Sequence, residues 1–368
     1  MDIPFDVELA WARRHMVRVQ KALANLPDLH TVRLAMSMHL DLKTILLVEG
    51  LLEHGAQLYL VTCNPSTVRD EVVAYMGRLG AEVQAWHDMP DAAYQKATLD
   101  AIAWGPTHLC EFGADLTAAS LEASRPAAVR ASLEGTGSGI ARLAGVRPPY
   151  PIFNWDDLPV KEGLHNRHMV GLTTWHTFFA RTRLTLHGKK VAVIGYGLVG
   201  EGVAASARAF GGTVLVVEID PARALQAAFD GWPVLSLAEA LPQADVVVTV
   251  TGAKRVIPAE SFQYLKEGVF LVNAGHRADE IDLAALNTHR HWTVMPHVEE
   301  YDLDGKTIFL FARGAMANLT AGEGDSLNAF DLTLALMVAG IGHIVGAGAE
   351  QPPGVYLLPR EVWEKVLL

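Results

Sequence analysis

The run VAVIGYGLVGEG, residues 191–202, constrains the fold of this chain more than any other feature. It places Gly195, Gly197 and Gly200 in a G-x-G-x-x-G spacing directly after an apolar strand and at the start of a helix. There the first glycine permits a tight turn, the second lets the backbone approach a pyrophosphate, and the third lets helix and strand pack closely. The phosphates lie at the positive N-terminus of the helix. The motif therefore predicts a doubly wound, Rossmann-like α/β domain that binds a dinucleotide.

The following strand, TVLVVE, indicates which dinucleotide is bound. It ends in Glu218, about 20 residues beyond the glycine turn. A carboxylate at this place accepts hydrogen bonds from the ribose hydroxyls and repels a 2'-phosphate, so the pattern favours NAD over NADP. Arg223 is close enough in the sequence to leave NADP open as an alternative.

Strand and helix patterns alternate in two separate series, which begin at Thr31 (TVRLAMSM) and at Lys189 (KKVAVIG). Each series predicts its own parallel sheet with helices on both faces. A length of 368 residues also favours two domains over one core. We expect a substrate-binding domain with a hinge segment over 1–171, a dinucleotide domain over 172–323, and a helix over 324–368 that returns to the first domain and ends in a short tail. Pro, Asn and Asp in 148–172 predict an exposed connection that acts as the hinge.

Composition excludes several classes of partner. The formal charge of -11 and the lack of Lys/Arg runs argue against nucleic acid. Cys63 and Cys110 show no disulfide or metal spacing, and the charged N-terminus is unlike a secretory signal, which favours the cytoplasm. The histidines are scattered, so the sequence names no metal-binding residues and gives no argument for or against a metal. The apolar stretch 332–349 is interrupted by glycines and bracketed by Asp331 and Glu350, which favours a buried helix with a glycine-rich turn over a membrane span.

Three segments read together, VAVIGYGLVGEG, VEIDPARALQAAFDGW and LVNAGHRADEID, resemble the S-adenosylhomocysteine hydrolase family. NWDDLPVKEGLHNRHMVG is similar to the family's hinge segment, and ANLTAGEGD to the segment whose asparagine, here Asn318, holds the nicotinamide side of NAD. The resemblance runs from about Val32 to about Pro359. It implies a two-domain enzyme, commonly tetrameric, that closes over a nucleoside and keeps NAD bound through the whole cycle.

The resemblance also implies a reaction. In the family the 3'-hydroxyl is oxidised to a ketone, which acidifies the neighbouring C4' proton, and removal of that proton expels the 5' substituent. Water then adds, and the stored hydride reduces the ketone again. Such a site needs a lysine at the 3'-hydroxyl, a base for C4' and imidazoles near C5'.

Four residues match the family's catalytic positions. Lys161 matches its lysine, which implies a role in 3'-oxidation, and Asn166 matches the asparagine that holds that lysine in place. His39 and His276, each after a predicted strand end, match two histidines near the 5' position. His165 replaces the family's aspartate; it could still carry a proton but would not attract the lysine unless it were neutral.

Other positions depart from the family pattern. In CEFGADLT the pair Glu111 and Phe112 replaces two aspartates, so the proposed C4' base is missing. Glu111 could substitute only if the strand twisted, because alternation points it to the other face of the sheet. In LEGTGSG, Glu134 is kept but Gly135 stands where the substrate-binding glutamate belongs, and Thr136 still matches a cofactor contact.

The base pocket is altered as well. Lys43 stands where the family has a glutamate toward the purine, and Asp325 where it has a histidine toward the purine. A different nucleobase, a different sugar or an added polar group is therefore expected, because buried polar groups discriminate strongly when left unpaired. The sequence also shows no family-type lysine- and tyrosine-bearing tail after YLLPREVWEKV, which predicts weaker cofactor binding.

These matches lead to one hypothesis and several alternatives. We expect NAD-dependent 3'-oxidation of a nucleoside with elimination at C5', by a hydrolase or by a dehydratase or lyase of nucleoside natural-product biosynthesis, in a homo-oligomer, tetramer or dimer. A catalytically silent NAD-binding regulatory homologue and an ordinary NAD-dependent dehydrogenase are the alternatives. The candidate cofactor contacts are Gly195, Gly197, Val199, Gly200, Glu218, Arg223, Thr136, Thr251, Asn273 and Asn318.

Overall fold

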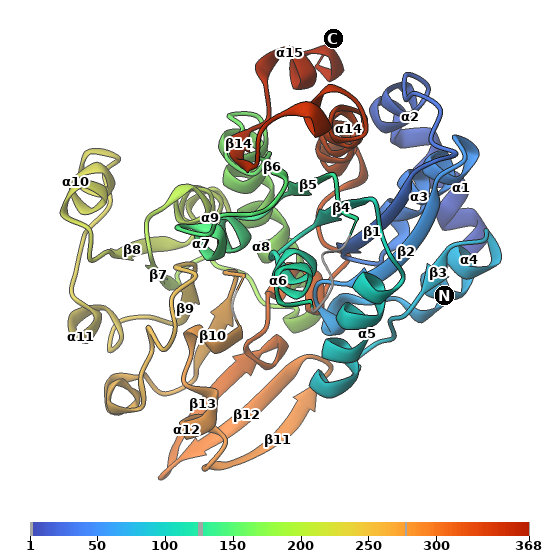
Figure 1. Cartoon of the computed structure of the whole chain (residues 1–368). Coiled ribbons are helices and arrows are strands. Elements are labelled where there is room, and N and C mark those ends of the chain that lie inside the picture. The colour runs from blue at the N-terminus through green and yellow to red at the C-terminus, as the bar shows by residue number, and fades with distance from the viewer. Residues whose placement is uncertain (1–2, 124–127, 277, 368) are drawn as a thin grey trace. The chain divides into compact units, whose positions relative to one another are not determined.

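The computed structural model describes residues 3–123, 128–276 and 278–367. The chain divides into two compact units (Figure 1). Unit 1 comprises 1–161 and 327–368, and unit 2 comprises 162–326. The divisions follow Lys161 and Ser326, whereas the sequence suggested boundaries after 171 and 323.

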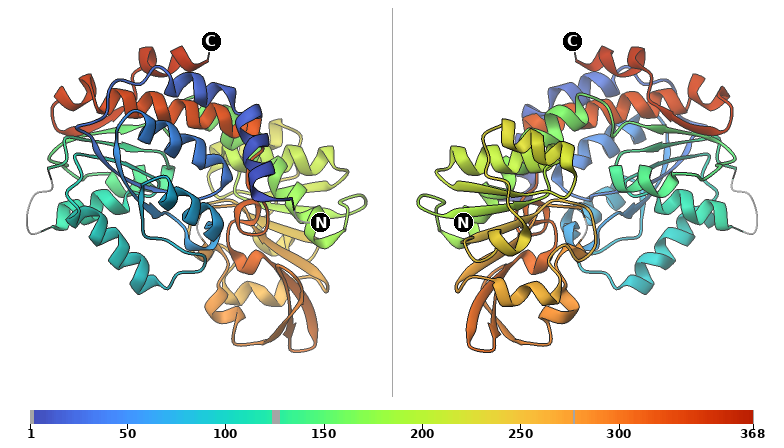
Figure 2. Two further views of the ribbon diagram at one scale, coloured as in Figure 1. Left: turned by 90° about the vertical axis from the view of Figure 1, so that its right-hand side faces the viewer. Right: turned by 90° about the vertical axis from the view of Figure 1, so that its left-hand side faces the viewer.

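Unit 1 is built on a parallel sheet with the strand order β14-β6-β5-β4-β1-β2-β3. Its strands lie next to one another in parallel register throughout. Their bounds are β1 Arg33–Met38, β2 Gln57–Thr62, β3 Glu82–Val83, β4 His108–Glu111, β5 Ala131–Glu134, β6 Pro151–Asn154 and β14 Gly354–Leu357. Most of these strands are buried along their length because helices cover both faces (Figure 2).

The helices of unit 1 include the expected buried helix near the C-terminus. They are α1 Phe5–His15, α2 Val17–Leu23, α3 Ile45–Glu53, α4 Asp70–Arg78, α5 Asp91–Ala103, α6 Asp115–Glu122, α7 Gly137–Leu143, α14 Leu327–Ile344 and α15 Arg360–Trp363. Helix α14 is apolar and long enough to cross a membrane, but 56% of it is buried inside the protein, beside α2 (Figure 2). Gly346 and Gly348 follow it, so the prediction of a core helix and a glycine-rich turn is confirmed.

Unit 2 contains a second sheet, with the order β11-β12-β13-β10-β9-β7-β8. The bounds are β7 Lys190–Ile194, β8 Thr213–Val217, β9 Val246–Thr249, β10 Val269–Asn273, β11 Arg290–Met295, β12 Val298–Leu303 and β13 Lys306–Phe311. The helices are α8 Gly171–Thr182, α9 Leu198–Ala209, α10 Pro221–Phe229, α11 Leu237–Ala240, α12 Leu283–Leu286 and α13 Ala317–Thr320. Five strands are parallel, and β12 runs antiparallel to β11 and β13 at one edge. The predicted fold class, two doubly wound α/β sheets, is confirmed.

The segment 148–172 differs from its prediction as an exposed connection. Residues 151–154 form the buried strand β6, and Lys161–Val170 form a π-helix that leads into α8. The expectation of an exposed loop is therefore wrong, because the apolar residues of PIFNW complete the sheet between β5 and β14 in spite of the flanking prolines. The division between the two units lies at the start of this π-helix.

Candidate active site

Lys161 is a buried cation in unit 1, and Asp156 is its partner. Its ammonium donates a hydrogen bond to Asp156 Oδ1, and both side chains are about nine-tenths buried. The ammonium also lies 5.9 Å from the centre of the Trp155 ring. Asp156 is held in turn, because its backbone N–H donates to the side chain of Asn154 at the end of β6. The turn after β6 therefore fixes a lysine with charge compensation supplied from five residues upstream.

The turn after β1 carries His39 and Lys43. His39 is half-buried, and its Nδ1 lies 2.8 Å from Thr67 Oγ1. Lys43 is 5% exposed; its ammonium lies 2.8 Å from an Asp41 carboxylate oxygen and 5.6 Å from the centre of the Phe330 ring. Both residues follow β1, which lies between β4 and β2 in the sheet. The strand order reverses there, and open sheets bind ligands at the carboxyl ends of the strands at such a point.

Glu111 and Glu134 end the adjacent strands β4 and β5 and are fully buried. Glu111 accepts hydrogen bonds from the backbone N–H groups of Leu116 and Thr117 at the start of α6. Glu134 accepts from the backbone N–H groups of Gly113, Ala114 and Thr136. Burial raises the pKa of both carboxyl groups, and repulsion from Glu134 raises the pKa of Glu111 further. Backbone N–H groups of unit 1 therefore donate hydrogen bonds to the carboxyl groups of both Glu111 and Glu134.

An aromatic contact lies at the ends of β4, β5 and β6. It joins the rings of Phe112 and Trp155, and Gly135 packs against both. The two rings lie 5.8 Å apart, and the His39 ring lies 6.1 Å from Phe112. A Cβ atom at Gly135 would come within 2.6 Å of both Phe112 and Trp155. Two departures from the family pattern, Phe112 and Gly135, are therefore one coupled change, because the ring occupies the space that any side chain at 135 would need.

The glycine turn of unit 2 fits a dinucleotide phosphate. Gly195 has φ +103°, which favours glycine, and a Cβ at Gly200 would overlap the carbonyl oxygen of Gly195. A Cβ at Gly197 would lie 3.2 Å from a guanidinium nitrogen of Arg223. The exposed Arg223 is thus next to the glycine where a pyrophosphate approaches. Half-buried Val199 lies in the first turn of α9. The backbone of the glycine turn and the guanidinium of Arg223 therefore surround the place where the pyrophosphate would bind.

Glu218, just after β8, lies beside this turn. Its carboxylate accepts hydrogen bonds from the backbone N–H groups of Tyr196 at 2.6 Å, Ile219 at 2.7 Å and Asp220 at 2.8 Å. These donors orient the carboxylate at the carboxyl end of the strand, where it would accept the ribose hydroxyls of NAD.

The ends of β9 and β10 hold three further candidates. Exposed Thr251 donates from its N–H and its hydroxyl to the buried carboxylate of Glu280, whose pKa is raised by burial. The Asn273 side chain is fully buried and links Gly275 N–H to the carbonyl of Gly314. His276 is exposed.

A buried polar network in unit 2 joins four side chains. His165 Nε2 lies 2.9 Å from Asp325 Oδ2, Thr173 Oγ1 lies 3.2 Å from Asp325 Oδ1, and Asn318 Nδ2 donates to Thr173 Oγ1 at 3.3 Å. Asn318 is 1% exposed, and within the described part of the chain its Oδ1 has no hydrogen-bond partner. An orphaned buried carboxamide oxygen fits the amide of a nicotinamide. The residues of unit 2 therefore fit NAD at its phosphate, ribose and nicotinamide ends.

The two remaining candidates are Asn166 and Thr136. Asn166 is half-buried in the π-helix, five residues after Lys161. Thr136 is half-buried at the N-cap of α7, where its hydroxyl accepts from Gly139 N–H at 3.0 Å and donates to Glu134 at 2.6 Å.

The structure brings some candidates together that sequence reasoning treated apart. His165 contacts Asp325 in unit 2, and Glu111 lies next to Glu134 in unit 1. Sequence reasoning missed Asp156, Thr173 and Glu280. Only Asp156 had a signal, since it lies in the NWDD run just before Lys161.

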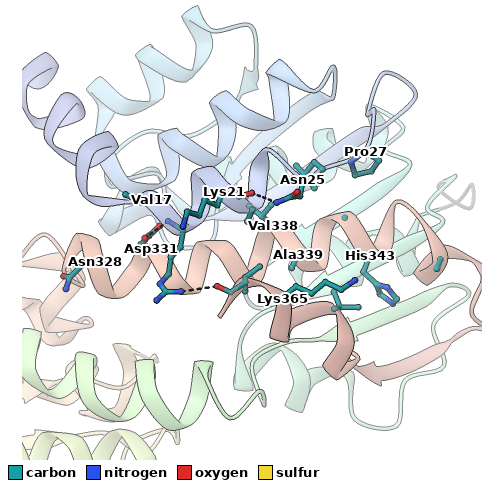
Figure 3. A pocket seen from close by; sticks show the side chains of 17 residues that line it. Val17, Lys21, Asn25, Pro27, Asn328, Asp331, Val338, Ala339, His343 and Lys365 are labelled. Atoms are coloured by element: carbon teal, nitrogen blue, oxygen red, sulfur yellow. Dashed lines mark hydrogen bonds between the residues drawn. The ribbon is translucent and has the colours of Figure 1, made fainter. Parts of the chain in front are cut away.

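A separate cavity of about 940 Å³ in unit 1 lies between α2, α14 and the C-terminal residues (Figure 3). Arg18, Lys21, Asp331, His343 and Lys365 are among its lining residues, and none of the candidate site residues is. Over residues 3–123, 128–276 and 278–367, no group of three or more His, Cys, Asp or Glu side chains is placed to hold a metal ion.

Comparison with known proteins identifies the family. Residues 7–137 match the family model described as S-adenosyl-L-homocysteine hydrolase, and residues 177–324 match that of its NAD binding domain. The chain is 33% identical to S-inosyl-L-homocysteine hydrolase of Methanopyrus kandleri, over 97% of this chain and 88% of that protein. It is 32% identical to adenosylhomocysteinase of Thermococcus kodakarensis, over 98% of this chain and 89% of that protein.

A solved structure shares the fold. A putative D-3-phosphoglycerate dehydrogenase oxidoreductase from Ralstonia solanacearum has a TM-score of 0.51 and 14% sequence identity, covering 87% of this chain and 98% of that one. At this identity the likeness concerns the fold alone.

Proposed function

Because the chain belongs to the S-adenosyl-L-homocysteine hydrolase family, a family of NAD-dependent enzymes, we propose that it oxidises a nucleoside transiently at the 3' position and eliminates the substituent at C5'. The observation that carries this proposal is Lys161, a buried ammonium compensated by Asp156. A lysine buried with a carboxylate partner is positioned to exchange a proton with a substrate hydroxyl. Bound NAD supplies the hydride acceptor and returns the hydride at the end of the cycle.

In this proposal Lys161 first gives a proton to Asp156, and its neutral amine then takes the 3'-hydroxyl proton. Asp156 also keeps the lysine side chain in place. Asn318 would hold the nicotinamide amide through its buried carboxamide oxygen, and Glu218 would accept hydrogen bonds from the ribose hydroxyls. We assign half-buried His39, at the end of β1, and exposed His276 to the leaving group or water at C5'. Hydrogen bonds hold the side chains of Lys161 and Glu218 in place, which lowers the entropy that the reaction must lose.

The nucleobase of the substrate is proposed to differ from adenine. Lys43 offers only N–H donors, whereas a glutamate at its place would offer acceptors. A buried donor suits a base with a carbonyl oxygen, and the Asp41 carboxylate and Phe330 ring hold the ammonium in place. The name of the Methanopyrus kandleri relative, S-inosyl-L-homocysteine hydrolase, is consistent with a 6-oxopurine.

Whether water adds after elimination separates two versions of the proposal. A hydrolase releases a thiol from a thioether nucleoside, whereas a dehydratase or lyase of nucleoside natural-product biosynthesis stops at a 4',5'-unsaturated nucleoside. The aromatic contact of Phe112 and Trp155 supports a non-standard substrate, because it removes acceptors from this side of the site. We further propose that the protein is a homo-oligomer and that it is located in the cytoplasm. The two free cysteines are consistent with this location.

The test is incubation of purified protein with S-adenosylhomocysteine, S-inosylhomocysteine and a panel of nucleosides, followed by mass spectrometry. Release of homocysteine from the inosyl compound in preference to the adenosyl one supports a 6-oxopurine hydrolase. Loss of water from an unconjugated nucleoside supports the lyase. Rapid homocysteine release from S-adenosylhomocysteine alone would rule out the divergent substrate.

A catalytically silent NAD-binding regulator is the second candidate, and one observation favours it. Phe112 and Gly135 replace two family carboxylates in a single packed contact. A silent protein would copurify with NAD but would turn over nothing in the panel. The buried Lys161 and Asp156 pair argues against it, because such a pair is costly to maintain without a chemical use.

A further inference from the structure

We infer that His165, oriented by Asp325, is the acid–base group that removes the C4' proton in place of the missing family carboxylate. The inference rests on the proposed function, because it assigns one step of that reaction. It starts from a contact inside unit 2, where His165 Nε2 lies 2.9 Å from Asp325 Oδ2. Both residues are buried, with 8% and 9% of their surface exposed.

The two residues are departures from the family pattern that compensate each other. The family has aspartate where this chain has His165, and histidine where it has Asp325. The structure shows the imidazole and the carboxylate in direct contact, so the two altered positions form a histidine–aspartate pair in this chain. An isolated exchange at either position would have left a buried polar group without a complementary neighbour. The imidazole lies in the π-helix that also carries Lys161 and Asn166.

The pair is connected to the nicotinamide end of the cofactor site. Asp325 Oδ1 lies 3.2 Å from Thr173 Oγ1, which accepts from Asn318 Nδ2 at 3.3 Å. The oxygen of that Asn318 carboxamide is the buried atom that fits a nicotinamide. Hydride transfer requires the oxidised sugar carbon within roughly 3–3.5 Å of the nicotinamide, and C4' is bonded to that carbon. Three polar contacts therefore link His165 to Asn318, the residue that would hold the nicotinamide, and C4' would lie near that end of the cofactor.

The carboxylates at the strand ends of unit 1 have other partners. Glu111 is held by backbone donors of α6, and Glu134 by those of Gly113, Ala114 and Thr136. Asp156 compensates Lys161, and Phe112 occupies the position of the family's base. We therefore assign the base to the imidazole of His165, which is oriented by Asp325.

Asp325 accepts the Nε2–H of His165 and so favours the tautomer in which Nδ1 is basic. Nδ1 takes the C4' proton, and the electron pair of the C–H bond enters the adjacent 3'-ketone to give an enolate. The enolate then re-forms the ketone and expels the 5' substituent with its bonding pair, giving a 4',5' double bond. The proton on His165 passes to the leaving group or to water.

The experiment separates oxidation from proton removal. The enzyme with its cofactor is mixed with S-inosylhomocysteine and the nucleoside panel in D2O; reduced-nicotinamide absorbance reports 3'-oxidation, and mass spectrometry reports deuterium at C4'. His165→Gln keeps an amide that can donate to Asp325 but has no basic nitrogen. We expect this variant to form reduced nicotinamide yet to lose C4' exchange by about 100-fold or more.

Two further measurements exclude a purely structural role. The reciprocal variant His165→Asp with Asp325→His keeps the pair but moves the imidazole, so we expect normal cofactor content and no C4' exchange. In 15N spectra we expect His165 as the Nε2–H tautomer, and a mixture of tautomers in Asp325→Asn.

Each other outcome has a distinct meaning. Undiminished C4' exchange in His165→Gln or in the reciprocal variant would overturn the inference. Loss of both the bound cofactor and the reduced-nicotinamide absorbance in both variants would also overturn it, because it would indicate a purely structural role. If the unmodified enzyme forms no reduced nicotinamide with any compound, the proposed function fails and the inference fails with it. Reduced nicotinamide in the unmodified enzyme without C4' exchange would refute the inference alone.

Discussion

At the scale of single residues, the candidate site depends on buried charges that have specific partners. Lys161 and Asp156 compensate each other in unit 1, and His165 and Asp325 lie in contact in unit 2. Burial makes each group sensitive to the loss of its partner, because an unpaired buried charge is far more unfavourable than a paired one. Stability measurements can therefore test these pairs independently of any substrate.

Asp156→Asn is expected to destabilise the protein by about 3 kcal/mol, because it leaves the Lys161 ammonium buried without its carboxylate. Lys161→Met should have a comparable effect for the opposite reason. The free energy of unfolding in denaturant, measured for both single variants and the double variant, checks this. The double variant should lose less than the two single variants together; simple additivity would show that the pair is not coupled.

Gly135→Ala is expected to destabilise the protein by roughly 1–3 kcal/mol, because its Cβ would lie 2.6 Å from the rings of Phe112 and Trp155. Gly77→Ala, in α4, is the matched control, since a Cβ there has nothing within 4 Å. Chemical denaturation should show a loss only for Gly135→Ala. Adding Phe112→Ala should restore part of it, and no restoration would mean that the coupling is absent.

Residue identities at the site could be predicted from the sequence only in part. The resemblance to the family predicted Lys161 and Asn318, and the strand after the glycine motif predicted Glu218. Neither could predict that Asp156 pairs with Lys161, because that contact depends on the turn after β6 and not on a fixed spacing. The contact between His165 and Asp325, 160 positions apart in the numbering, likewise depends on the tertiary fold.

At the scale of elements, the π-helix Lys161–Val170 is held against α9 by close backbone packing. A Cβ at Gly202 would overlap the carbonyl oxygen of Arg167, and Arg167 also lies 2.8 Å from Glu201. A Cβ at Gly171 would lie 2.5 Å from the backbone of Gly202. Glycines on both elements therefore allow the segment with His165 and Asn166 to pack on the dinucleotide-binding helix.

Gly202→Ala should weaken this packing and raise the hydrogen-exchange rates of the amides in 161–170, because either the π-helix or α9 must move away. Gly163→Ala lies in the same π-helix, and a Cβ there meets nothing within 4 Å, so its exchange rates should stay close to those of the unmodified protein. Equal exchange rates in the two variants would contradict the packing argument.

Element prediction succeeded where periodicity was strong. The helix expected at the glycine motif is α9, Leu198–Ala209, and the strand expected at TVLVVE is β8. It failed at β6, where proline-rich flanks outweighed a short apolar run, and it did not foresee that β12 runs antiparallel to its neighbours. Strand direction depends on pairing partners, which local patterns do not specify.

At the scale of the whole molecule, two sheets were predictable because each repeats strand and helix in alternation. The course of the chain back into unit 1 followed from the apolar stretch that forms α14. The raised pKa values of the two buried carboxyl groups were not predictable from the sequence. Glu111 and Glu134 become neighbours only because β4 lies next to β5.

This buried carboxyl pair predicts how stability depends on pH. Both pKa values are raised above the ordinary value of 4.5, so the folded state binds more protons than the unfolded state between 4.5 and the raised values. Stability is therefore fully present below that window and falls as the pH rises through it, by up to about 1.4 kcal/mol per pH unit for each group. Denaturation of the unmodified protein and of Glu111→Gln across this range checks it. The variant should show a shallower fall; identical slopes would contradict the assignment.

The central claim is that bound NAD oxidises a nucleoside with the help of Lys161, and rapid-mixing absorbance measures this directly. On addition of the nucleoside substrates, the near-ultraviolet absorbance of reduced nicotinamide should rise and decay without net reduction of the cofactor. Lys161→Ala, with cofactor content checked, should abolish the rise. An unchanged rise in that variant, or a steady accumulation of reduced cofactor released to solution, would contradict the account.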